Sequence, residues 1–170
     1  MNRLIVTGTN GVGKSHLSAR LSAARSIPVV SFDAIKLKTS WRQRSRPEID
    51  TALAAELERP AWILEGGPSL LEQALPKADG LVWLDPPEHI RAWRLAVRPW
   101  KHYGKTRNEL PAGNIDWPLQ QYRFAWRSLK NGARNRAYLS RVFHTATVRK
   151  WQCRGCESLD QVVEDWARAK

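Results

Sequence analysis

The feature that most constrains the fold of this chain is the stretch from residue 3 to residue 24. It opens with the apolar run Leu4-Ile5-Val6, which is rich in β-branched residues, ends at Gly8 and predicts a buried strand. The next eight residues are Gly8-Thr9-Asn10-Gly11-Val12-Gly13-Lys14-Ser15, a full match to the phosphate-binding pattern G-x-x-x-x-G-K-[ST]. Leu17, Leu21 and Ala24 follow at helical spacing. Strand, loop and helix therefore come in the order that a phosphate-binding loop requires.

The residue types in this loop explain the chemistry that it can perform. Glycines let the backbone bring a row of N–H groups close to an anion, at the positive end of the following helix. Lys14 supplies a mobile charge for the β- and γ-phosphates, and the Ser15 hydroxyl is a hard oxygen ligand for Mg²⁺. We therefore predict that residues 8–15, with His16 beside them, bind a nucleoside triphosphate, taken as ATP, together with Mg²⁺.

The remainder of the chain alternates between strand and helix patterns. Further strands are predicted over residues 27–32, 61–64, 80–84 and 147–151, and helices over residues 47–57, 69–75, 88–98, 119–139 and from Ser158 onward. This alternation predicts an α/β, three-layer fold with a five-stranded parallel sheet. At 170 residues the chain is expected to form one domain, with a core over 1–98 and 140–170 and a basic lid and helical segment over about 99–139.

The positive charge is concentrated in one segment. Residues 91–150 hold 14 of the 28 Lys and Arg residues but only two carboxylates, Glu109 and Asp116, whereas the remaining residues are balanced at 14 and 14. The same segment contains nine of the fifteen aromatic residues. A solvated face usually mixes both signs of charge, so we expect a polyanion, DNA in particular, to bind segment 91–150.

The composition also bears on location and on metals. No apolar run is long enough to cross a membrane and no secretory signal opens the chain, so we expect a cytoplasmic protein without a membrane partner. Cys153 and Cys156 have C-x-x-C spacing, but no second pair completes a zinc site.

The order of motifs resembles the adenylate-kinase-like P-loop kinases over nearly the whole chain, and within them the group known as DNA topology modulation proteins. The stretches that carry the resemblance are the loop, Phe32-Asp33, Trp41, residues 62–67, Leu84-Asp85-Pro86-Pro87, Trp93-Arg94 through Arg98, residues 104–107 and residues 122–127. Glu65 stands where the group usually has Asp, Gly67 replaces Asn, and the lid lacks its acidic and cysteine-containing pattern. Phage kinases that phosphorylate 5-hydroxymethyluracil within DNA look like relatives of this architecture.

Two carboxylates are candidates for the reaction centre. Asp33 follows a strand and is expected to accept the proton of the attacking hydroxyl or to position it, although it could instead cap a turn. Glu65 ends the strand expected beside the first one, where a carboxylate would hold Mg²⁺ or its water. Asp85 is a rival of Glu65 for the Mg²⁺ role and ranks second to it. In the resembling kinases this strand end is structural, and its strand lies across the sheet.

The substrate side is predicted from both the residues and the resemblance. Lys36 lies three positions after Asp33, as in polynucleotide kinases of similar fold, and Trp41 matches the group's tryptophan; Gly66 and Gly67 are expected to let the substrate approach the backbone. Arg94 and Arg98 share one helix face, and the resemblance implies that such a pair reaches the adenine and the γ-phosphate. Arg107, Arg123 and Arg127 are candidates for the arginine that stabilises the transferring charge.

Three functions remain open from the sequence. The first is an ATP-dependent kinase acting on a hydroxyl of a nucleic acid, such as a 5-hydroxymethylpyrimidine base in phage DNA, since the basic, aromatic segment would bind it. The second is a kinase of a free nucleoside, nucleotide or other small molecule, which needs only a few arginines. The third is a DNA-binding regulator that senses ATP, to which Asp33 and the Arg94 and Arg98 pair contribute nothing.

Overall fold

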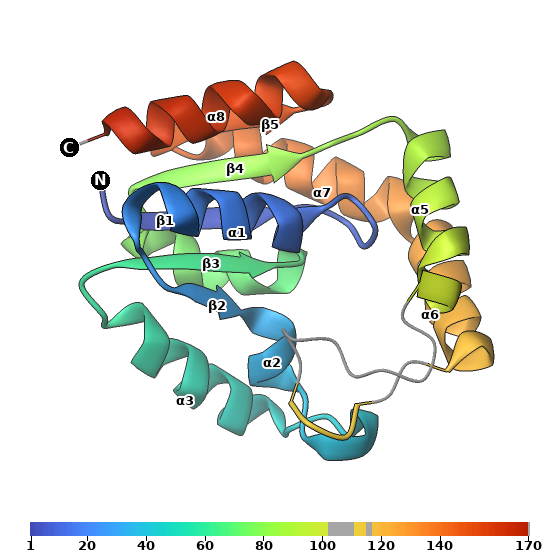
Figure 1. The fold of residues 1–170 in the computed structure, drawn as a ribbon. Helices are drawn as coiled ribbons and strands as arrows, with labels where there is room; N and C mark the ends of the chain where they lie inside the picture. The colour runs from blue at the N-terminus through green and yellow to red at the C-terminus, as the bar shows by residue number, and fades with distance from the viewer. Residues whose placement is uncertain (102–110, 115–116, 170) are drawn as a thin grey trace.

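A parallel sheet forms the centre of the computed structural model, which describes residues 1–101, 111–114 and 117–169 (Figure 1). In the described residues its strands run in the order β2-β3-β1-β4-β5. Their bounds are β1 (Arg3–Thr7), β2 (Val29–Ser31), β3 (Trp62–Gly66), β4 (Gly80–Leu84) and β5 (Arg149–Cys153). The predicted five-stranded parallel sheet is therefore confirmed.

Helices cover both faces of the sheet and bury it. On one face Leu4, Val6 and Val82 pack against α1 (Lys14–Arg25) and α8 (Cys156–Arg168). On the other face Ile5 and Leu81 pack against α3 (Arg46–Leu57), α4 (Leu71–Ala74) and α7 (Gly132–Thr145). Because side chains alternate along a strand, β1 supplies apolar residues to both layers, and this explains its continuous apolar run.

Two helices stand beyond the carboxyl ends of the strands, α5 (Glu88–Lys101) and α6 (Pro118–Lys130) (Figure 1). The helix predicted over 88–98 continues to Lys101, so Pro99 lies inside it rather than after it. A proline this close to a helix end removes only one backbone hydrogen bond. The helix predicted over 119–139 divides into α6 and α7, with Gly132 first in α7. A Cβ at Gly132 would lie 2.6 Å from Arg91 Nη2, so the division falls where α5 passes closest.

The structure corrects several predicted boundaries. The second strand ends at Ser31, and Asp33 lies in the first turn of α2 (Phe32–Lys36), which is followed by the 3₁₀ turn η1 (Thr39–Trp41). Residues 34–46, for which the sequence analysis predicts neither strand nor helix, are therefore partly helical. After β3 ends, the chain forms two short 3₁₀ turns, η2 (Pro68–Leu70) and η3 (Leu75–Lys77), on either side of α4. The last helix begins at Cys156, and the Ser158 hydroxyl, expected at its cap, instead accepts a hydrogen bond from the N–H of Gly155 from within the first turn.

The strand order also changes the expected neighbours of the loop. β3 pairs with β1 and places Glu65 beside Val6, as predicted. The strand of Asp85, however, is not across the sheet: β4 pairs directly with β1, whereas β2 lies at the edge beside β3. None of the helices in the described parts of the chain is both long and apolar enough to span a membrane.

Candidate active site

The phosphate-binding loop lies between the end of β1 and the start of α1, and its glycines are required by geometry. Gly11 has φ of +86° and Gly13, the N-cap of α1, has φ of +101°, both in the left-handed region. A Cβ at Gly11 would also lie 2.8 Å from Leu95 Cγ on α5. The loop is thus held tightly against α5, with the N-terminus of α1 facing its concave side.

Lys14 lies inside this loop and is partly enclosed by it. Its Nζ donates to the carbonyl oxygens of Gly8 (3.2 Å) and Thr9 (3.0 Å). Burial lowers the pKa of Lys14, while the negative charges of Asp33 and Glu65 act in the opposite direction. The charges of Lys14, Asp33 and Glu65 therefore interact with one another. An anion bound here would stabilise the charged form of Lys14.

Ser15 and Glu65 form a pair of oxygen donors at the same place. The Ser15 hydroxyl donates to Glu65 Oε1 at 3.2 Å, and the Glu65 side chain is buried on β3. The described residues contain no group of three or more His, Cys, Asp or Glu side chains arranged to hold a metal by themselves. Mg²⁺ commonly uses one or two protein oxygens together with substrate phosphates and water. The Ser15 and Glu65 donor set fits that pattern.

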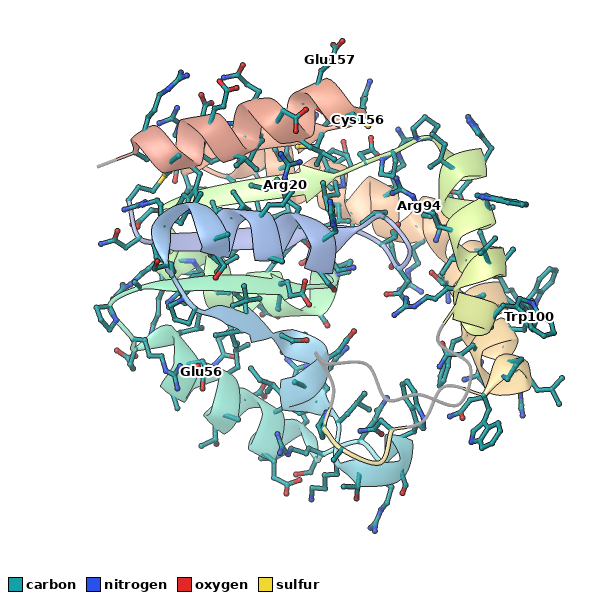
Figure 2. All side chains as sticks on the ribbon, in the orientation of Figure 1. Arg20, Glu56, Arg94, Trp100, Cys156 and Glu157 are labelled. Atoms are coloured by element: carbon teal, nitrogen blue, oxygen red, sulfur yellow. The ribbon has the colours of Figure 1, made fainter. Side chains whose placement is uncertain are left out.

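A cavity of about 540 Å³ opens on this loop and is called the nucleotide-side cavity. Arg94 lines it, points from α5 toward the loop (Figure 2), and donates from Nη1 to the Val12 carbonyl at 3.0 Å. His16 lines it as well. Its apolar lining includes Trp93, Val97 and Leu159, to which the sequence analysis assigned no part in binding. They come from α5 and α8, which no local motif joins.

A second cavity, of about 410 Å³, lies between α2, η1, α5 and α6 and is called the acceptor-side cavity. It brings together six residues that the sequence analysis assigned to catalysis or substrate: Asp33, Lys36, Trp41, Gly67, Arg98 and Arg127. The amides of Gln121, Asn131 and Asn135 also line it and were not predicted, because no motif marks them.

The two cavities meet at three residues, Asn10, Asp33 and Arg98, which line both of them. The Asp33 carboxylate is paired with Lys36 Nζ at 3.1 Å, as an i,i+3 pair within α2. An anionic phosphate in the first cavity and an acceptor in the second would therefore share a wall made of one carboxylate and one guanidinium.

The remaining predicted residues have different positions. Gly66 lines the nucleotide-side cavity, and a Cβ there would lie 2.4 Å from Leu70 Cδ2, so its small size serves packing. Arg123 lines neither cavity and borders a hollow on the outer side of α6. Arg107 lies outside the described residues.

One wall of the acceptor-side cavity is conformationally strained. Ser40 and Trp41 have φ of 56° and 58°, a region that bulky side chains rarely adopt. The buried Asn114 holds this turn: its Oδ1 accepts from the Trp41 N–H at 2.5 Å and its Nδ2 donates to the Lys38 carbonyl at 3.0 Å. In this conformation the Trp41 ring packs on Phe124 of α6, with centroids 5.7 Å apart. No motif in the sequence marks Asn114.

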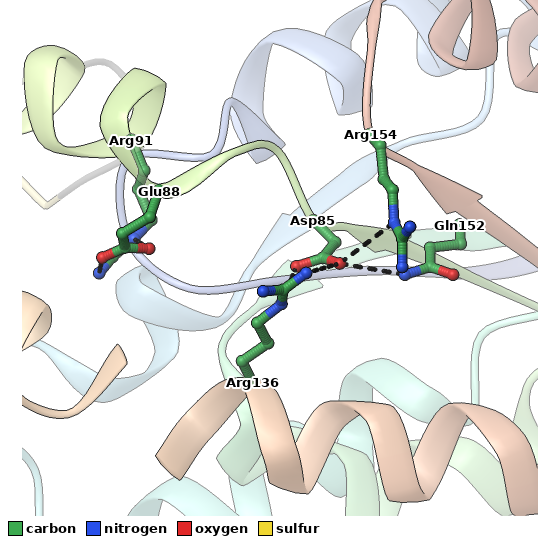
Figure 3. Close-up of polar contacts among 6 residues, drawn as sticks. All are labelled: Asp85, Glu88, Arg91, Arg136, Gln152 and Arg154. Carbon is green, nitrogen blue, oxygen red and sulfur yellow. Dashed lines mark hydrogen bonds and ion pairs between the residues drawn. The ribbon is translucent and has the colours of Figure 1, made fainter. Parts of the chain in front are cut away.

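Arg91 is another residue that the sequence analysis missed, and it is almost completely buried. It pairs with Glu88 (Figure 3), and its Nη1 donates to the Asn10 carbonyl (3.3 Å) and to Ser128 Oγ on α6 (3.1 Å). Its single guanidinium therefore joins the phosphate-binding loop to a residue that lines the acceptor-side cavity.

Asp85 has a different set of contacts, which Figure 3 shows. Its buried carboxylate accepts from Arg136 Nη2 (2.9 Å) and Gln152 Nε2 (3.0 Å) and pairs with Arg154 (3.5 Å). Hydrogen bonding to Asp85 raises the pKa of Arg136. Asp85 therefore connects the end of β4 to α7 and to the segment after β5, as a structural carboxylate would.

Solved kinases share this fold at low sequence identity. A shikimate kinase from Acinetobacter baumannii, in complex with shikimate, is similar with a TM-score of 0.55 and 15% identity, over 97% of this chain and 90% of that one. A sugar kinase from Janibacter has a TM-score of 0.51 and 12% identity, over 98% and 91%. A shikimate kinase from Bacteroides thetaiotaomicron has 0.55 and 14%, over 96% and 95%. No family model matches the sequence, and no curated protein matches it.

These similarities confirm the predicted P-loop kinase fold. The finer resemblance, to the DNA topology modulation group and to phage hydroxymethyluracil kinases, stays a prediction.

Proposed function

We propose that this protein is an ATP-dependent phosphotransferase that transfers the γ-phosphate to a hydroxyl of a small, anionic molecule. The observation that carries the proposal is the shared wall of the two cavities, where Asp33 and Arg98 face both. In-line transfer requires a donor phosphate on one side of such a wall and an acceptor on the other.

The nucleotide would occupy the first cavity. The backbone N–H groups of the loop and Lys14 would bind the phosphates, and Arg94 is close enough to the loop to contact them. Trp93 and Leu159 provide an apolar surface for a purine ring. Ser15 and Glu65 would hold Mg²⁺, which neutralises phosphate charge when it is bound.

The transfer itself would use Asp33 and Arg98. The acceptor hydroxyl oxygen forms a bond to the γ-phosphorus while the bond to the β-phosphate oxygen breaks, and ADP leaves. Asp33 accepts the hydroxyl proton, with Lys36 holding its carboxylate in place. Arg98 offsets the charge that moves between the two cavities.

The chemistry of the acceptor-side cavity supports a small, hydroxylated anion. Among the described residues its charged lining is three cations, Lys36, Arg98 and Arg127, and one carboxylate, that of Asp33. Beside them lie the amides of Gln121, Asn131 and Asn135, which can donate to and accept from hydroxyl groups. The similar solved kinases are named for small acceptors, shikimate and a sugar, and this favours the second of the three functions open from the sequence.

The test is transfer of labelled γ-phosphate from ATP to parallel acceptors: hydroxylated carboxylates, sugars, free nucleosides and nucleotides, plain DNA and DNA carrying hydroxymethylpyrimidines. We expect label in one class of small anion. Asp33→Asn should retain ATP binding and lose transfer by about 10²- to 10⁴-fold. Asp50→Asn, an exposed carboxylate on α3, is the matched control and should transfer normally. Full turnover by Asp33→Asn would remove Asp33 from the base role.

A nucleic-acid acceptor is the second candidate, because the basic, aromatic segment 91–150 exceeds what a small substrate needs. Label in hydroxymethylpyrimidine DNA alone would establish it. DNA binding that survives Lys14→Ala, with no transfer to any acceptor, would instead indicate an ATP-sensing regulator.

A further inference from the structure

The outer surface of α5 and α6 carries large aromatic side chains that the fold leaves in solvent. Trp93 and Trp126 are each 71% exposed, Trp100 is 67% exposed and Leu119 is 83% exposed. Figure 2 shows Trp100 pointing away from the sheet. Monomeric proteins rarely leave contiguous apolar side chains of this size in water without a binding role.

The two helices bring these side chains onto one surface. Toward the end of α5, Trp100 Nε1 donates to Oη of Tyr122 in the first half of α6, at 2.6 Å. Near the start of α5, Arg91 donates to Ser128 near the end of α6, so the two helices run antiparallel. This register sets Trp126 level with Trp93. We call the surface formed by Trp100, Leu119, Tyr122, Arg123, Trp126 and Lys130 the tryptophan face; Trp93 lines the nucleotide-side cavity and is not counted in it.

Within the part of the chain that the structure describes, the charge on the tryptophan face is of one sign. Arg123 and Lys130 follow Leu119 and Trp126 by four residues and are exposed on the same side of α6. Between residues 91 and 150 the only carboxylates in the sequence are Glu109 and Asp116, which lie outside the described residues. Glu88, at the start of α5, is engaged by Arg91.

We propose that the tryptophan face binds single-stranded nucleic acid, a function that goes beyond the proposed phosphotransfer. Exposed tryptophans offer surfaces on which unpaired bases stack, and the surrounding cations contact the phosphates. A duplex hides the faces of its bases, so the face favours single strands. A two-fold dimer through this face would bring cations against cations, which opposes self-association.

The test is fluorescence anisotropy of a labelled oligothymidylate, compared with a duplex of equal length. We expect tighter binding of the single strand, weakening with salt by a slope of about 0.7 per neutralised phosphate. Trp100→Ala with Trp126→Ala should weaken binding at least about tenfold, because each stacked base is lost. Tyr138→Ala removes another exposed aromatic, 40% exposed on α7 and outside the face, and should change nothing.

Thermal shift with ATP and Mg²⁺ checks that the double variant is folded and still binds nucleotide, since neither tryptophan lines a cavity. Binding that is equal in the double variant and the parent would overturn the proposal, as would an absence of binding at low salt. A dimer in sedimentation that the double variant dissociates would assign the face to self-association instead. Each of these outcomes leaves the phosphotransfer assay independently readable.

Discussion

The two cavities of this protein are built in different ways. The nucleotide-side cavity takes its phosphate-binding loop from eight consecutive residues, Gly8 to Ser15, fixed between a central strand and the first helix. The acceptor-side cavity is assembled from α2, η1, α5 and α6, which are distant in the sequence. The phosphates of a nucleotide can be bound by one contiguous motif. The acceptor substrate, by contrast, is recognised by side chains that only the fold brings together.

The two sides also differ in how they are held. The loop follows the buried strand β1, whose Leu4, Ile5 and Val6 are fully buried. The acceptor side depends on a few specific contacts, among them Asn114 to the η1 turn and Trp41 to Phe124. We therefore expect changes on the nucleotide side to abolish transfer altogether, and changes on the acceptor side to alter substrate use and local stability.

The largest effect is expected for Lys14→Ala. Removing the charge that contacts the phosphates should lower kcat on the order of 10³-fold with every acceptor, because the donor side is common to all of them. The measurement is steady-state transfer from ATP, with Lys77→Ala, an exposed lysine paired with Glu58, as the control. A loss below tenfold would contradict the assignment of this loop to catalysis.

Alanine variants of Arg127 and Arg123 test whether the substrate stays in the acceptor-side cavity or extends over the outer side of α6. Arg127 lines the cavity, so Arg127→Ala should lower kcat/KM for the acceptor by about 10- to 100-fold, the value of a charged hydrogen bond, and leave KM for ATP unchanged. Arg123→Ala, one helical turn away, should have little effect on transfer of a small acceptor. Equal losses would show that the substrate extends over the outer side of α6.

Gly66 and Gly67 form a matched pair at the end of β3. A Cβ at Gly66 would lie 2.4 Å from Leu70 Cδ2 and 2.8 Å from Phe32 Cβ, so Gly66→Ala should cost about 1–3 kcal/mol of unfolding free energy. A Cβ at Gly67 meets nothing within 4 Å, so Gly67→Ala should be close to neutral. Urea unfolding measures both, and equal costs would contradict the packing role of Gly66.

Asn114 tests how the acceptor wall is held. Asn114→Ala removes the partners of the Trp41 N–H and the Lys38 carbonyl, and should cost about 1–3 kcal/mol of unfolding free energy. Ser40→Gly relieves a left-handed residue and should cost nothing or stabilise by up to about 1 kcal/mol. Thermal or urea unfolding checks both. Destabilisation by Ser40→Gly would show that the turn is not strained.

The smallest effect is expected for Glu48, which supports the same acceptor-side segment. Hydrogen bonds from Lys38 and then Ser45 lower the pKa of Glu48 from 4.5 to about 2 in the folded protein. Its contribution is therefore fully present above pH 4.5 and is lost as the pH falls toward 2. The hydrogen-exchange protection factor of the Ser45 amide, which donates to Glu48, should fall as the pH falls over this interval, and Glu48→Gln should remove this pH dependence. An unchanged pH dependence in Glu48→Gln would exclude this carboxylate as the cause.

The fold could be predicted from the sequence because its signals are local. The apolar runs that became β1, β3 and β4 fill both faces of one sheet, and the loop pattern needs only adjacent residues. Boundaries were predicted less well where short elements compete. The second strand was taken too far because Phe32, which is apolar, in fact begins α2, and Pro99 did not end α5.

The sequence by itself determined the nucleotide side of this protein, because eight consecutive residues carry the backbone geometry, the charge and the hydroxyl that phosphate binding needs. Only the tertiary structure decided the acceptor side. Asn114 acts through contacts with residues more than 70 positions away, and Arg91 donates to Asn10 and Ser128 from another helix. Asp33 of α2 and Arg98 of α5 line both cavities because the fold brings these two helices to the same two cavities. Such roles depend on distances across the fold, which no local pattern of residues records.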